Sequence, residues 1–238
     1  LTAGVSAILV AWMLGPRRDF PHGIRPPHAP WMVMVGAALL WVGWFGFNAG
    51  SALKAGADAG MTMLATHLAA ATATCVWIAI EWIKYGKPSL VGAVTGTVAG
   101  LATITPASGF VGPLGAVALG IVGGTVCYVA VGIVKRGFKV DDALDVLGVH
   151  GVGGVLGSLL LPFAAVLGVG GTGLAHPVLE QFSIQAQGIV VTLFWSLAVT
   201  FVIVKIVASV CGLRTDRESE IQGLDFSYHG EAGYHRDT

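Results

Sequence analysis

The sequence predicts an all-α polytopic membrane protein, and its composition is the first observation behind that prediction. Hydrophobic residues make up 55% of the 238 residues and charged residues only 11%, whereas soluble domains carry about 25% charged residues. Glycine is frequent, with 35 residues, as in helices that pack closely in lipid. The formal net charge is zero, so nothing in the composition favours a nucleic-acid partner.

The apolar segments predict one partial and six full membrane spans. Residues 1–15 are apolar, but a helix of that length rises only about 22 Å, less than the roughly 30 Å hydrocarbon core. We therefore expect this segment to be the second half of a span. The third full span is the weakest because it is short and rich in glycine. The full spans are expected at 31–53, 57–83, 89–105, 112–134, 143–167 and 183–211.

The placement of charges supports this count, because the connections alternate between basic and nearly uncharged. Under the six-span count, eleven of the 13 Lys and Arg residues fall on one side, and the positive-inside rule makes that side the cytoplasm. The two exceptions are Lys54 and Lys205, and Lys205 can snorkel towards the tail. The eleven residues are Arg17, Arg18, Arg25, Lys84, Lys87, Lys135, Arg136, Lys139, Arg214, Arg217 and Arg236.

Two regions follow from this pattern. Residues 1–211 are expected to form a transmembrane transporter domain, and residues 212–238, where the sequence becomes polar, a cytoplasmic C-terminal tail. We expect the tail to take an ordered course against the membrane domain or a partner, although its composition alone would favour disorder. Three cysteines without a C-x-x-C pair indicate packing residues, so we expect neither a metal site nor a cofactor.

His150 is the most informative single residue, because it lies well inside the fifth full span. An imidazole at membrane depth is costly unless it has a partner or lines a cavity. A neutral imidazole donates from one nitrogen and accepts at the other, which suits the passage of a polar solute or a proton. His150 is therefore either a pore residue or a core histidine that is bonded to a neighbouring carbonyl.

A second cluster closes the first full span. Asn48 and Ser51 are three residues apart, which places them on one helix face beside Trp44 and Phe47. Aromatic faces can attract a small cation, and a serine hydroxyl can accept a hydrogen bond from it. The alternative is an ordinary aromatic belt at the membrane interface.

Three carboxylates precede the fifth full span. We expect Asp141 and Asp142 to complement the helix N-terminus, and Asp145, which lies deeper, to hold a buried backbone or hydroxyl partner. A further intramembrane histidine, His67, has no glycine or carboxylate nearby in the sequence. We interpret it as a packing or helix-contact residue.

Taken together, these residues resemble the ammonium transporter (Amt/Mep/Rh) family, and its Amt branch more than its Rhesus branch. The likeness covers essentially the whole chain. The segments that carry it are 43–51, 87–90, 104–107, 140–142 and 145–151, with 223–225, 229–231 and Tyr234 in the tail.

The resemblance implies a fold of two inverted five-span repeats followed by a long last helix, assembled as a homotrimer with one pore per subunit. This chain would then be the C-terminal part of such a fold: a partial fifth span, the second repeat, the last helix and the tail. It would be half of an inverted-repeat fold. The other half of the pore wall, with the second of two twin histidines, would precede Leu1.

Carried over by position, the resemblance assigns each candidate residue a role. Ser51 would belong to an outer ammonium site, and Phe47 would be the inner member of a phenylalanine gate. Trp44 and Val146 would line the pore, and His150 would be one of the twin histidines. The structural residues near the pore would be Asn48 and Asp145, the latter as symmetry mate of an acidic residue in the first repeat.

The function that the resemblance implies is transport of ammonium or ammonia across the cell membrane, without enzymatic chemistry. Ammonium would be recruited outside, lose its proton near the gate and pass along His150. The expected partners are the lipid bilayer, two further copies of the chain and a PII-type signalling protein at the tail. The alternatives are a Rhesus-type gas channel and an ammonium sensor that signals through its tail.

Overall fold

The computed structural model describes residues 1–22, 26–166 and 170–233, and within these ranges the chain is helical without a β-strand. The all-α prediction is confirmed. Arg25, Leu167, Tyr234 and Arg236, which the sequence analysis used, lie outside the described residues. The elements are α1 (Thr2–Leu14), α2 (Pro30–Ala49), η1 (Gly50–Ala52), α3 (Ala57–Tyr85), α4 (Leu90–Ile104), α5 (Pro113–Gly132), η2 (Ile133–Gly137), η3 (Leu147–Gly151), α6 (Val152–Ala164), α7 (Val178–Cys211), α8 (Arg217–Gln222) and η5 (Asp225–His229).

Five helical segments of the described chain are long and apolar enough to cross a membrane. They are Pro30–Ala52, Ala57–Tyr85, Pro113–Gly137, Leu147–Ala164 and Val178–Cys211. The predicted third span is the helix α4, which has only 15 residues, of which 11 are buried. That α4 also crosses the membrane stays a prediction, which the alternation of basic connections requires.

Two of the predicted spans begin more than one residue away from the expected start. The fifth begins at Leu147 rather than at 143, because Asp145 has a left-handed backbone (φ 58°) that a continuous helix cannot contain. The sixth begins at Val178 rather than at 183, so α7 is the longest helix, with 34 residues.

Glycines let α4 and α5 approach α3 backbone to backbone. A Cβ atom at Gly100 of α4 would lie 2.5 Å from the carbonyl oxygen of Ala69, and one at Gly120 of α5 would lie 2.7 Å from the same oxygen. Neither distance is possible for a real side chain, so both positions require glycine. The four-residue spacing of Gly96 and Gly100 in α4 and of Gly120 and Gly124 in α5 therefore marks a packing face in which three helices meet.

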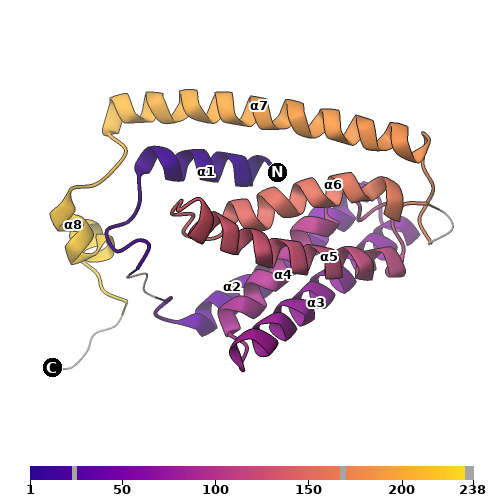
Figure 1. The fold of residues 1–238 in the computed structure, drawn as a ribbon, viewed down its shortest axis with the longest axis horizontal. Helices are drawn as coiled ribbons and strands as arrows, with labels where there is room; N and C mark the ends of the chain where they lie inside the picture. The colour runs from indigo at the N-terminus through magenta and orange to yellow at the C-terminus, as the bar shows by residue number, and fades with distance from the viewer. Residues whose placement is uncertain (23–25, 167–169, 234–238) are drawn as a thin grey trace.

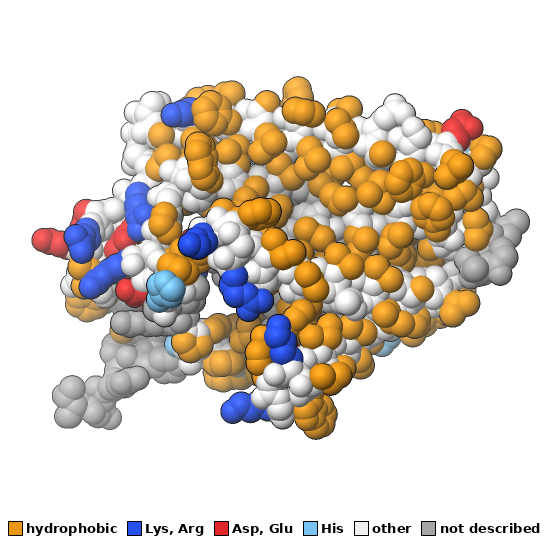
Figure 2. Space-filling model, viewed as in Figure 1, with side chains coloured by type: hydrophobic (Ala, Val, Ile, Leu, Met, Phe, Trp, Pro, Cys, Tyr) orange, Lys and Arg blue, Asp and Glu red, His pale blue; other side chains and the backbone are white. Residues whose placement is uncertain are grey.

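The helix α7 lies along α1 and α6 on the outside of the bundle, as Figure 1 shows. The hydroxyls of Ser6 in α1 and Thr200 in α7 lie 2.8 Å apart and join the two helices. Large apolar side chains of α7, such as Phe194 and Trp195, are exposed, and apolar side chains cover much of the face in Figure 2. Such a surface suits contact with lipid.

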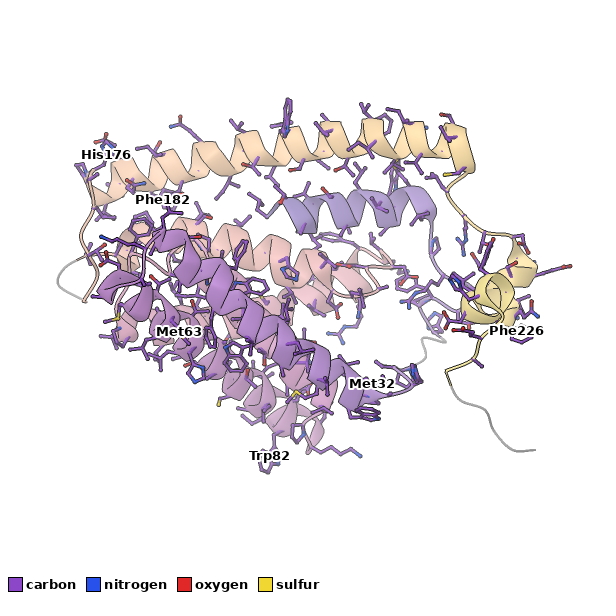
Figure 3. The ribbon with its side chains drawn as sticks, turned by 180° about the vertical axis from the view of Figure 1, so that it is seen from behind. Met32, Met63, Trp82, His176, Phe182 and Phe226 are labelled. Carbon is purple, nitrogen blue, oxygen red and sulfur yellow. The ribbon has the colours of Figure 1, made fainter. Side chains whose placement is uncertain are left out.

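The two ends of the molecule differ in charge. Figure 2 shows most Lys and Arg side chains gathered towards the end that holds the tail helix α8. In Figure 3, His176 and Phe182 lie at one end and Phe226, in the tail, lies at the opposite end. The positive end and the tail therefore coincide, as the alternation of charges predicted.

Candidate functional site

An aromatic–histidine cluster brings together α2 and η3, which are about 100 residues apart in the sequence. The ring of Trp44 is stacked on that of His150, with centroids 6.1 Å apart and planes 18° apart. Phe47, one turn along α2, meets Trp44 edge to face at 5.9 Å. Three of the predicted pore residues thus form one continuous group of rings.

Thr105 fixes the orientation of Trp44 in this cluster. The indole Nε1 of Trp44 donates to Thr105 Oγ1 at 2.8 Å, and that hydroxyl in turn donates to the carbonyl oxygen of Leu101 at 2.7 Å. Sequence analysis used Thr105 only as part of a family segment and gave it no role. The signal that could have found it is a hydroxyl at the end of a glycine-rich helix, close to the proline at position 106.

Asn48 and Ser51 have different surroundings, although helical spacing places them on one face. Asn48 is buried, and its Nδ2 donates to Thr66 Oγ1 of α3 at 3.0 Å. Ser51 is exposed, and its Oγ donates to the carbonyl oxygen of Phe47 at 2.8 Å. Helical spacing sets the direction of the two side chains but not what covers them: Thr66 of α3 contacts Asn48, whereas Ser51 lies in the following 3₁₀ turn η1 and stays exposed.

The π-helical turn η3 holds His150 between several close neighbours. A Cβ at Gly148 would lie 2.7 Å from Cγ2 of Val131 in α5, and one at Gly4 of α1 would lie 2.4 Å from Cα of Gly151. These close contacts place the backbone on either side of His150 against α5 and α1. The imidazole itself is half-buried. Such π-helical turns occur frequently at functional sites.

Asp142 anchors the start of η3. Its side chain is buried, and its two oxygens accept hydrogen bonds from the backbone N–H groups of Val146 at 3.0 Å and Leu147 at 2.7 Å. These N–H groups begin the helix and have no carbonyl partner within it. Val146 is therefore placed by Asp142 and lies half-buried immediately before the turn that carries His150.

The other two carboxylates have different partners from those expected. Asp141 does not cap the helix but forms a bidentate ion pair with Arg17, with contacts of 2.7 and 2.8 Å. These hydrogen bonds lower the pKa of Asp141 below its ordinary value. Asp145 was expected to hold a backbone or hydroxyl partner and instead pairs with Lys135 at 2.7 Å. The left-handed backbone at Asp145 is the reason, because it turns the chain between the carboxylates and the helix.

His67 lies apart from this cluster, on the face where α3 meets α2. Its ring is 5.2 Å from that of Trp41 and 6.1 Å from that of Phe45, both of α2. This geometry agrees with the helix-contact role that the sequence indicated.

The fold and this cluster define a helical membrane protein with a polar and aromatic site between its spans. The chain matches the model of the Ammonium Transporter Family over residues 1–234, and it belongs to that family. The family is one of transporters, not of enzymes. The resemblance to this family that the sequence indicated is therefore confirmed.

Known proteins show the same relationship in sequence and in structure. The chain is 43% identical over 235 residues to an ammonium transporter of Aquifex aeolicus, covering 98% of this chain and 55% of that protein. It is 41% identical over 237 residues to an ammonium transporter of Bacillus subtilis, covering 98% of this chain and 58% of that protein. The chain thus spans about half the length of the curated relatives it matches.

Two solved structures have the same fold. A sensor Amt protein superposes with a TM-score of 0.85 at 33% identity, covering 94% of this chain and 56% of that chain. Mep2 of Saccharomyces cerevisiae superposes with a TM-score of 0.77 at 33% identity, covering 90% of this chain and 52% of that chain.

Proposed function

We propose that the protein containing these residues moves ammonium or ammonia across the cell membrane, along a path that passes Ser51, Phe47, Trp44, Val146 and His150. The observation that carries the proposal is the stack of Trp44 on His150, with Phe47 against the same indole. It supplies an aromatic face for a small cation and an imidazole for a proton within one group of rings.

Ser51 has the geometry of a receptor for ammonium. Its hydroxyl donates to the carbonyl oxygen of Phe47, so the lone pairs of its oxygen stay available to accept from an N–H donor. Phe47, which is 64% exposed, lies one helical turn before it. A cation that has shed water could therefore bind at Ser51 before it passes the phenyl ring.

Loss of a proton fits the step after Phe47. Desolvation in an apolar path disfavours a charge, and neutral ammonia can donate to and accept from the imidazole of His150. Thr105 would keep Trp44 parallel to this imidazole through its hydrogen bond to the indole.

The deciding experiment compares two intramembrane histidines in the protein expressed from its complete reading frame. His150→Ala should assemble normally but lose methylammonium uptake or change its discrimination between ammonium and potassium. His67→Ala, which removes a ring outside the cluster, should keep both properties. If His150→Ala keeps wild-type uptake and selectivity at matched amounts of assembled protein, the pore role is wrong, whatever happens to the melting temperature.

The tail and the assembly are part of the same proposal. Residues 1–211 would be the transporter domain of a homotrimer, and residues 212–238 a cytoplasmic tail that can bind a PII-type signalling protein. Support for an ordered tail comes from Arg214, which donates to the carbonyl oxygens of Leu14 and Pro16 at 3.3 and 2.9 Å and pairs with Glu220. Tyr228 is hydrogen-bonded to Thr215 at 2.6 Å.

A second candidate function is that of an ammonium sensor. The likeness to the sensor Amt protein and the contacts of Arg214 with the end of α1 favour it. A sensor would change the environment of its tail when ammonium binds, without net uptake. Uptake by the wild-type protein that saturates with ammonium would reject a purely sensory role.

A further inference from the structure

We propose that Thr66 of α3 is a positioning residue for the candidate pore. Its Oγ1 accepts a hydrogen bond from Asn48 Nδ2 of α2 at 3.0 Å, and α2 is the helix that carries Trp44 and Phe47. The inference rests on the proposed transport function and adds a residue outside the aromatic–histidine cluster. Thr66 would act on the substrate through α2, by fixing the direction in which this helix presents its rings.

The side of α2 that faces α3 has one directional contact. The rings of Trp41 and Phe45 on this side lie 5.2 and 6.1 Å from that of His67. Asn48 continues the same side at helical spacing. Among the described residues, its bond to Thr66 is the only side-chain hydrogen bond that joins α2 to α3. Apolar burial has no preferred direction, whereas a hydrogen bond requires a short distance and a favourable angle. The bond therefore restricts rotation of α2 about its own axis.

The hydroxyl of Thr66 can serve Asn48 only as an acceptor. It donates its proton to the carbonyl oxygen of Thr62 at 2.7 Å, one turn earlier in α3, so its lone pairs remain for α2. Thr66 is fully buried, and Asn48 is 4% exposed. Loss of the hydroxyl would therefore leave the buried amide of Asn48 without this partner, which is unfavourable.

The adjoining side of α2 carries the rings of the candidate pore. Trp44 and Phe47 precede Phe45 and Asn48 by one position each, and one position in an α-helix is a rotation of about 100°. Any turn of α2 relative to α3 would therefore turn Trp44 and Phe47 by the same angle. The effect should be largest at Phe47, because α2 ends at Ala49 and helix ends fray.

The test compares three variants of the protein expressed from its complete reading frame. Thr66→Val keeps the shape of the side chain and removes the acceptor, whereas Thr66→Ser keeps the acceptor. The control Thr62→Val removes another buried hydroxyl of α3, which donates to the backbone of Asp58 and not to α2. The kinetics of methylammonium uptake are measured at matched amounts of assembled protein.

We expect Thr66→Val to raise the KM about fivefold, the factor that corresponds to one hydrogen bond of ordinary strength. The KM should respond because Phe47 and Ser51 receive the cation in the proposed path. In Thr66→Ser and Thr62→Val the KM should stay within about twofold of the wild-type value, since both keep an acceptor for Asn48.

A second measurement follows the outer end of α2 without transport. Ser51→Cys, in a background without other cysteines, is labelled with a soluble thiol reagent in detergent. Added Thr66→Val should raise the labelling rate several-fold, because the end of α2 is held less firmly. Added Thr62→Val should leave the rate unchanged. If Thr66→Val does not assemble, Thr66→Ala also lacks the acceptor, adds no bulk and gives the same comparison.

The contribution of Asn48 is tested by a double variant. If Thr66 acts through Asn48, the KM of Asn48→Ala with Thr66→Val should equal that of Asn48→Ala alone. A further rise in the double variant would overturn the proposal. So would an unchanged KM and labelling rate in Thr66→Val, or equal changes in Thr62→Val, which would indicate a general loss of packing in α3. If the wild-type protein shows no uptake, the proposed transport function fails, and the labelling rates alone decide whether Thr66 positions α2.

Discussion

Asp142 offers the sharpest test of how the candidate site is held in place. Its carboxylate accepts hydrogen bonds from the N–H groups of Val146 and Leu147, at 3.0 and 2.7 Å, at the start of the turn that carries His150. Asp142→Ala would leave both partly buried N–H groups without an acceptor in the protein. A hydrogen bond to a charged group is worth about 1.5–3 kcal/mol. Since both bonds share one carboxylate, we expect a loss of about 2–4 kcal/mol in the free energy of unfolding.

Two further variants are compared with Asp142→Ala. Asp142→Asn keeps one oxygen as acceptor and should lose about half as much stability. Asp58→Ala is the control, because it removes a carboxylate whose ion pair with Lys54 is exposed, with side chains 77% and 73% exposed. Such a pair should contribute about 1 kcal/mol or less.

The assay is unfolding in mixed detergent micelles, followed by circular dichroism, with methylammonium uptake measured in parallel. Asp142→Ala should lower both stability and uptake, because the start of η3 positions Val146 and His150. If Asp142→Ala were no less stable than Asp58→Ala, the reasoning that the buried carboxylate anchors this turn would be refuted.

Three further predictions follow from other contacts. Because hydrogen bonds from Arg17 lower the pKa of Asp141, the pair stabilises the fold above the ordinary aspartate pKa of about 3.9, and this contribution is lost as the pH falls through the lowered value. Arg17→Gln should therefore flatten the pH dependence of stability below about pH 4, and an unchanged slope would contradict it. Gly100→Ala should cost about 1–3 kcal/mol by overpacking, whereas Gly60→Ala, with no atom within 4 Å of the new Cβ, should be neutral or slightly stabilising in thermal unfolding. A cysteine at Ser219, in a background without other cysteines, should resist an impermeant thiol reagent applied to intact cells, and labelling from outside would disprove a cytoplasmic tail.

Much of the fold could be predicted because its determinants are local in the sequence. A run of apolar residues long enough to cross the hydrocarbon core indicates a helix wherever it packs, and five of the predicted spans have that length and character in the structure. The glycine spacing on α4 and α5 likewise marked their packing face. The charge alternation predicted one positive end, and the tail lies there.

The candidate site depended on contacts that the sequence could not reveal. Trp44, Thr105 and His150 come from three separate elements, and only packing decides that the indole lies between the hydroxyl and the imidazole. Helical spacing likewise did not reveal the different surroundings of Asn48 and Ser51, because α3 contacts Asn48 through Thr66 and leaves Ser51 exposed.

The class of protein, the approximate spans, the positive end and the residue types of the site all follow from the amino-acid sequence. Which of three neighbouring carboxylates anchors the helix of His150, by contrast, depends on how the chain packs. Asp145 has a left-handed backbone and turns the chain at this point. Asp142 accepts hydrogen bonds from the helix N–H groups, and Asp145 forms an ion pair with Lys135. Side-chain contacts between different helices depend on such single backbone angles. The periodicity of side chains along a sequence does not predict these angles.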